Sequence, residues 1–239
     1  MKTKNVLLIT ALLMFFYSGN AQTKINNSEL LKSELDTISK QKLPIVSVAL
    51  NQQGNWIILY GDIGFSFVSM PAKLSDKLDK LNKKQIPLKD IDFVNKSGWV
   101  LLAEDNAFYS DSIPENLLSG LKRINQQGKI IKCIDVYKDR NVVLYTYKSH
   151  YQQNTSPLLK KKLSDLKYRN QKVKNVALTK DNGWIVLYAA KGFSYHNIPV
   201  AMSTKIKELI QNGSSLNKVF FLGEKWIVVY DNYKYISNL

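Results

Sequence analysis

A short run of apolar residues recurs five times along the chain, at intervals of about 43 residues. The runs read WIILY, WVLLA, NVVLY, WIVLY and WIVVY, and they begin at Trp56, Trp99, Asn141, Trp184 and Trp226. An aromatic residue follows nine positions later, or ten in the third repeat, and in the first four repeats a proline follows six positions after the aromatic. Self-similarity at a period of this size indicates a protein built from repeated structural units.

Each repeat predicts three strands and a helix. Apolar and variable residues alternate before each apolar run, as in a strand with one buried face. Turn residues such as NKSG and KDNG lead into the run itself, which is apolar on both faces and therefore predicts a central strand. The aromatic lies in a short third strand. We expect the proline to occupy the first position of a helix, whose apolar stripe is Leu74, Leu78 and Leu81 in the first case.

The two ends of the repeat array favour one of two architectures. The pattern SELLKSELDTISKQ predicts a helix before the first strand, whereas the fifth repeat stops after its third strand. We therefore predict an α+β repeat protein of five αβββ units of about 43 residues, closed as a propeller-like ring. The alternative is an open αβββ solenoid, which needs polar capping segments. The predicted domain covers residues 28–239, with units near 28–70, 71–113, 114–156, 157–198 and 199–239.

The repeat motif resembles that of a known group of proteins. The pattern D-x-G-W-[IV]-V-L-Y-x-x-x-G-[FY]…I-P, clearest at residues 181–199, is similar to tandem repeats in a family of secreted bacterial proteins. The resemblance spans about residues 28–239. It implies a propeller-like repeat fold and export, and it implies no activity.

Residues 1–21 predict a Sec-type signal peptide. Lys2 and Lys4 precede a 12-residue apolar run, and Gly19 and Ala21 are small residues at the positions that a cleavage site before Gln22 requires. The run is shorter than the roughly 20 residues of a membrane-spanning helix. We expect an exported protein, periplasmic or extracellular, with no transmembrane segment and with a short linker at residues 22–27.

The chain is strongly basic, with 34 Lys and Arg against 19 Asp and Glu and a formal net charge of +15. Such a charge favours anionic partners such as an acidic polysaccharide, but a solvated lysine-rich surface has the same composition. Export and the lack of a nucleic-acid-binding motif argue against a specific nucleic-acid partner. The single cysteine, Cys133, leaves no internal disulfide.

The sequence contains no recognised catalytic or cofactor motif. It has no G-x-S-x-G, P-loop, G-x-G-x-x-G or H-E-x-x-H pattern. Its two histidines and one cysteine do not have the spacing of zinc ligands. We therefore predict no cofactor and no metal. Cys133 directly precedes the apolar Ile134, so alternation predicts that its side chain faces away from the apolar side of its strand.

Asp92 and Asp135 form the first candidate ligand site. Each follows the alternating apolar residue of a first strand, at equivalent positions of neighbouring repeats. If the first strands surround a central axis, the two carboxylates lie side by side and can hold a cation or a sugar hydroxyl. The alternative is that both are solvated or paired with lysines.

The third repeat provides the second candidate site. It lacks the tryptophan, carries one extra residue between positions 141 and 151, and has Ser156 where other repeats have an apolar residue before the proline. Its hydrogen-bonding residues, which suit sugars or peptides, are Tyr145, Tyr147, His150, Tyr151 and Gln153. The alternative is a less stable unit that has drifted from the repeat.

Together these patterns predict a secreted or periplasmic, non-catalytic binding module for a cell-envelope glycan or a protein partner. The alternative is an enzyme with an unrecognised active site that uses the Asp92 and Asp135 pair or His150.

Overall fold

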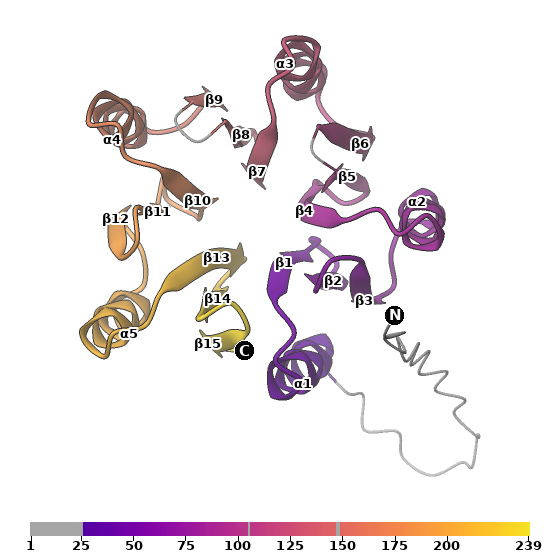
Figure 1. Ribbon diagram of the computed structural model, residues 1–239, viewed down its shortest axis with the longest axis horizontal. Coiled ribbons are helices and arrows are strands. Elements are labelled where there is room, and N and C mark those ends of the chain that lie inside the picture. Colours follow the sequence, from indigo (N-terminus) through magenta and orange to yellow (C-terminus); the bar gives the residue numbers. More distant parts are fainter. Residues whose placement is uncertain (1–25, 105, 147–148) are drawn as a thin grey trace, which may run out of the picture.

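The computed structural model describes residues 26–104, 106–146 and 149–239. The predicted signal peptide and Tyr147 therefore lie outside the described residues. The described chain forms five sheets of three antiparallel strands and five helices, arranged around a common centre (Figure 1).

The first strand of each sheet lies nearest the centre, as Figure 1 shows. These strands are β1 (Ile45–Leu50), β4 (Leu88–Val94), β7 (Ile131–Tyr137), β10 (Val173–Leu178) and β13 (Leu216–Leu222). The apolar runs form the middle strands β2 (Trp56–Tyr60), β5 (Gly98–Ala103), β8 (Arg140–Tyr145), β11 (Trp184–Tyr188) and β14 (Lys225–Tyr230). The prediction that they are central is confirmed, because each pairs with a strand on both sides.

The third strands and the helices complete each unit. The third strands are β3 (Gly64–Val68), β6 (Ala107–Asp111), β9 (Ser149–Gln153), β12 (Gly192–His196) and β15 (Lys234–Ser237). The helices, at the periphery in Figure 1, are α1 (Asn27–Lys40), α2 (Ala72–Lys83), α3 (Glu115–Gln126), α4 (Pro157–Tyr168) and α5 (Val200–Gln211).

The predicted position of the prolines is right for only one helix. Pro157 is the first residue of α4, whereas the prolines before α2, α3 and α5 are N-cap residues with ψ of 134°, 139° and 133°. An N-cap residue has extended rather than helical ψ, which proline adopts readily. In α4 the cap is Ser156, whose side chain accepts a hydrogen bond from the Leu159 N–H. Ser156, which stands where other repeats have an apolar residue before the proline, is thus the N-cap of α4.

A hydrophobic cluster lies between each pair of consecutive sheets and includes one face of a helix. Between the first two sheets, α2 contributes Leu74, Leu78 and Leu81, which are at most 4% exposed. Helices α3, α4 and α5 fill the same place between the following pairs. Burying one aliphatic side chain stabilises the fold by about 1.5–3 kcal/mol, so each helix fastens two sheets together.

Helix α1 packs between the last sheet and the first in the same way. Its buried residues Leu31, Leu35 and Ile38 share a cluster with β1 and β2 and with β13 and β14. The backbone also repeats: the N–H of Ile45 donates to the carbonyl of Asn232 at 2.9 Å, as the N–H of Leu88 donates to the carbonyl of Asp62 at 2.7 Å between the first two sheets.

The prediction of a propeller-like ring is confirmed in part. Five units of three strands and a helix are present. The sheets themselves are not closed into a ring, because among the described residues no strand of one sheet pairs in a ladder with a strand of the next. Neighbouring units meet through side chains and single hydrogen bonds instead.

Each first strand carries one irregularity at the same place, where its pairing with the middle strand shifts by one residue. Such a bulge re-aims the side chains beside it. The residues directly after the shift are Ser47, Asp90, Cys133, Asn175 and Lys218. Cys133 lies in the cluster beside α4, whereas Ile134 lies in the cluster beside α3, so the prediction that Cys133 faces away from the side of Ile134 is confirmed. That opposite face is buried as well, because Cys133 is 2% exposed.

Candidate functional site

The first strands enclose a cavity of about 370 Å³, called here the axial cavity. Its wall comes from β1, β4, β7 and β13, with Asn175 from β10. The exposed turn residues Gln52, Asn95 and Lys138 also line it, so the cavity opens on the side of the turns that follow these strands. Its size suits a small molecule or one inserted side chain.

The floor of the cavity is built on Asp90, which is 2% exposed. Its carboxylate accepts hydrogen bonds from Ser47 Oγ at 2.7 Å, from the Ile134 N–H at 3.0 Å and from Lys218 Nζ at 3.1 Å. A buried carboxylate needs such partners to offset its lost hydration. Asp90 thereby joins the second sheet to the first, third and fifth, and its charge is paired with that of Lys218.

Asn175 continues the polar floor. Its Oδ1 accepts from the Val219 N–H at 3.0 Å, and its Nδ2 donates to Cys133 Sγ at 3.5 Å. Burial raises the pKa of the Cys133 thiol. A raised pKa disfavours the thiolate, and Cys133 packs in the cluster beside α4.

The sequence analysis missed Ser47, Asp90, Asn175 and Lys218. The signal was present, because a polar residue stands in four of the five repeats immediately before the buried apolar residue of the first strand. Alternation places this position on the face opposite Val48 and its counterparts, and the structure shows that a neighbouring sheet covers that face.

Asp92 and Asp135 lie above this floor, and the structure brings them together as predicted. Asp92 Oδ2 accepts from the N–H of Val136, the residue after Asp135, at 2.6 Å, and Asp92 Oδ1 accepts from the Phe93 N–H at 2.8 Å. Asp135 Oδ2 accepts from the Leu178 N–H at 2.8 Å. Each carboxylate therefore links its own sheet to the next.

The electrostatics of this pair disfavour two negative charges. Burial raises the pKa of Asp92 well above its usual value, and the charge of Asp135 raises it further. Burial also raises the pKa of Asp135 to about 7, although the hydrogen bond from Leu178 opposes the rise. The hydrogen bonds just described come from backbone N–H groups, which carry no net charge to neutralise the carboxylates.

The opposite wall is apolar. At the position of Asp92 and Asp135, the first and fifth sheets carry Ala49 and Phe220, and both line the cavity. Leu50, Phe221 and Leu222 extend this apolar wall. The axial cavity is thus amphipathic, with carboxylates on the second and third sheets and apolar side chains on the first and fifth.

The third repeat has a different alignment from the one predicted. His150 pairs with Leu144 across the strands, as Phe65 pairs with Leu59 in the first sheet. His150 therefore occupies the aromatic position that the sequence analysis gave to Tyr151. The predicted extra residue between 141 and 151 is wrong, and no extra residue precedes α4 either, because Ser156 takes the N-cap position that Pro71 has before α2 and Pro157 follows it.

Tyr145 and Tyr151 pack between the second and third sheets. The Tyr151 hydroxyl donates to the Asn116 carbonyl at 3.2 Å, and its ring lies where a Cβ on Gly120 of α3 would approach within 2.7 Å. Tyr145 contacts the same hydrophobic cluster, with the Lys129 ammonium 5.3 Å from its ring centre.

The remaining members of the second candidate site lie on β9. Gln153 Oε1 accepts from Asn141 Nδ2 at 3.1 Å, at the place where other sheets have tryptophan. His150 is partly buried, and burial and the charge of Lys167 lower its pKa. Neither residue lines the axial cavity, so the two predicted sites are separate.

Two general features complete the site's surroundings. Within residues 26–104, 106–146 and 149–239, no three His, Cys, Asp or Glu side chains are grouped so as to hold a metal ion. None of the helices in that part of the chain combines the length and apolar character needed to cross a membrane.

Comparisons with known proteins found distant structural similarity and no sequence match. No family model matches the chain, and no curated protein matches it. A solved structure of YCF48 bound to D1 peptide is similar over 82% of this chain and 78% of that chain, at 7% identity and a TM-score of 0.34. A structure of YCF48 from Cyanidioschyzon merolae is similar over 81% of this chain and 50% of that chain, at 12% identity and a TM-score of 0.27. TM-scores this low establish neither a shared fold nor a shared function.

Proposed function

We propose that the protein is an exported, non-catalytic binding module whose ligand site is the axial cavity. The observation that carries this proposal is the lining of the cavity, where two carboxylates face an apolar wall above a floor whose own charges are paired. Concave sites with an apolar wall and a few convergent polar groups are the usual form of ligand sites.

The groups needed by the enzyme alternative are not gathered in one place. Asp92 and Asp135 line the cavity, whereas His150 lies on β9, outside the cavity lining. The Asp92 and Asp135 pair is the part of the alternative that keeps support, since coupled carboxyl groups can act as acid and base. The binding experiment below therefore also tests whether the partner is chemically changed.

The partner in this proposal is a protein. Asp90 and its partners Ser47 and Lys218 cross the inner end of the cavity, which favours a side chain or a chain end, whereas a polysaccharide that continues past its site needs an open groove. Export rests on the pattern of residues 1–21 and on the resemblance to secreted bacterial repeat proteins. The proposal also takes α1 as the element that completes the ring, because it packs between the last and first sheets as the other helices pack between theirs.

The test uses residues 22–239 as bait for envelope proteins. Gln52 is exposed at the mouth of the cavity, so Gln52→Trp should block entry without disturbing the core. Gln211→Trp, at the exposed end of α5, is the matched control. We expect a protein that binds the wild type and the control, loses binding to Gln52→Trp, and is recovered chemically unchanged.

Equal retention by all three proteins would place the binding surface outside the cavity. A partner that is released cleaved or otherwise altered would make the protein an enzyme.

A further inference from the structure

We propose that the group entering the axial cavity is a cation on an apolar stem, the side chain of a lysine or arginine that projects from an acidic surface of the partner protein. This inference rests on the proposed function, because it names the chemistry that the same cavity selects.

The apolar wall of the cavity favours the methylene groups of a lysine or arginine side chain. Leu50, Phe221 and Leu222 line the cavity on the first and fifth sheets, at the ends of β1 and β13 and therefore near the mouth. A lysine or arginine stem of three or four methylene groups covers such a surface while its charged head reaches beyond it. Phe220 also lines the cavity, at the strand position that Asp92 and Asp135 have on their sheets.

The charge is selected by Asp92 and Asp135. They stand together on neighbouring strands, and the groups that hydrogen-bond them are uncharged backbone N–H groups. The positive charge of Arg140 acts on Asp135, but the Arg140 guanidinium bonds the Thr179 carbonyl. A cation between them stabilises both ionised forms at once. The floor does not compete for it, because Lys218 already pairs with Asp90 at 3.1 Å.

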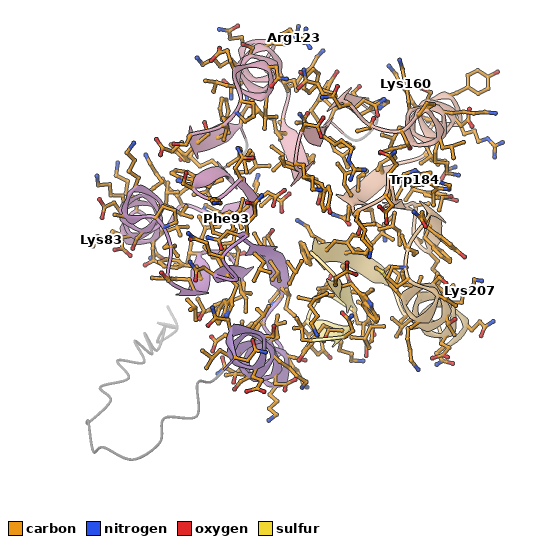
Figure 2. All side chains as sticks on the ribbon, turned by 180° about the vertical axis from the view of Figure 1, so that it is seen from behind. Lys83, Phe93, Arg123, Lys160, Trp184 and Lys207 are labelled. Atoms are coloured by element: carbon orange, nitrogen blue, oxygen red, sulfur yellow. The ribbon has the colours of Figure 1, made fainter. Side chains whose placement is uncertain are left out.

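The basic side chains at the periphery of the molecule favour an acidic partner surface around that cation. Figure 2 shows Lys83, Arg123, Lys160 and Lys207 projecting outward from the peripheral helices. The chain as a whole carries a formal charge of +15. A broadly basic partner is repelled by this surface, whereas an acidic one is attracted to it. The combination fits an acidic segment with a single projecting lysine or arginine.

The experiment uses synthetic peptides, acetylated and amidated, in which one lysine stands between glycine, serine and aspartate residues. A second peptide has norleucine in place of lysine, which keeps the apolar stem and removes the charge. Calorimetry at pH 7 in two buffers of different ionisation enthalpy measures the affinity and the protons released. Wild type, Asp135→Asn and Gln52→Trp are compared, after thermal unfolding has shown that each is folded.

We expect the lysine peptide to bind the wild type about tenfold or more tightly than the norleucine peptide, with release of protons. Asp135→Asn should remove this difference, and Gln52→Trp should abolish binding of both peptides. Asp135→Asn is preferred to a change at Asp92, since only one Asp135 oxygen bonds a backbone N–H while both Asp92 oxygens do.

Equal affinities for the two peptides would overturn the cation while leaving the cavity as the site. Binding of the lysine peptide that Gln52→Trp does not weaken would overturn the proposed function as well. If neither peptide binds the wild type at millimolar concentration, the inference about the cation is also overturned. A partner captured through the cavity would still support the proposed function.

Discussion

The hydroxyl of Tyr235 donates a 2.6 Å hydrogen bond to Asp36 Oδ1, joining β15 to α1 across 199 positions of the sequence. The contact lowers the pKa of the Asp36 carboxyl, with the hydrogen bond from Tyr235 as its largest cause. It belongs to the same junction as the cluster formed by Leu31, Leu35 and Ile38. The junction between the last and first sheets can therefore be tested residue by residue.

Replacing Tyr235 by Phe should lower the free energy of unfolding by about 1 kcal/mol, because one hydrogen bond to a partly exposed carboxylate is lost. Urea denaturation measures the change. Tyr233→Phe is the control, because it removes a tyrosine hydroxyl two residues away, from a ring that lies beside Lys234. In an Asp36→Asn background the Tyr235→Phe cost should shrink, and an unchanged cost would show that the hydrogen bond contributes nothing.

Leu35→Ala should destabilise the protein by about 2–5 kcal/mol, as expected for a fully buried leucine. Leu78→Ala is the matched variant, because both leucines are 0% exposed and lie at equivalent positions of α1 and α2. We expect similar losses in chemical denaturation. If Leu35→Ala costs only a few tenths of a kcal/mol while Leu78→Ala costs the full amount, α1 does not complete the fold.

Asp135→Asn should stabilise the protein more at pH 8 than at pH 4.5. The unfolded carboxyl ionises near pH 4, whereas the pKa in the folded protein is about 7. Between these values the folded state binds more protons than the unfolded state, so the wild type loses stability as pH rises through this window. The variant lacks that loss, and its advantage should grow by roughly 1–3 kcal/mol from the lower pH to the higher.

Urea denaturation at the two pH values measures this growth. Asp76→Asn, at an exposed position of α2, is the control and should change stability by the same amount at both. An Asp135→Asn effect that is equally independent of pH would contradict the raised pKa.

Gln153→Ala should destabilise the protein by about 1–3 kcal/mol, because it leaves a buried amide without its partner. That amide belongs to Asn141, which is 4% exposed and donates to Gln153 Oε1. Gln152→Ala is the neighbouring control, where the lost bond is to the partly buried hydroxyl of Thr155. Thermal unfolding of both variants measures the difference, and Gln153→Ala should have the lower melting temperature.

The ligand-facing interpretation of Tyr145, Tyr147, His150, Tyr151 and Gln153 stays a prediction. Affinity for the partner should be unchanged in a folded His150→Ala variant if the axial cavity is the site. A loss of binding there would return the site to β9.

The sequence by itself determined the repeat and its local elements. Strand alternation at Val48 and Leu50, the helical stripe of Leu74, Leu78 and Leu81, and the turn residues between them are encoded within one unit. These periods reflect local backbone geometry, which a single repeat carries without its neighbours. The same periodicity also placed Asp92 and Asp135 on the axis.

The tertiary structure decided which side chains meet between units. The pairing of Asp90 with Lys218 joins residues 128 positions apart, and it depends on how the second and fifth sheets face each other across the centre. A shift of one residue in a strand moves every side chain after it to the other face. For this reason His150 rather than Tyr151 takes the aromatic position. Cys133 is buried because the fourth sheet and α4 cover the face on which alternation places it. The cavity exists only where five such strands meet, so its amphipathic lining could not be read from any single repeat.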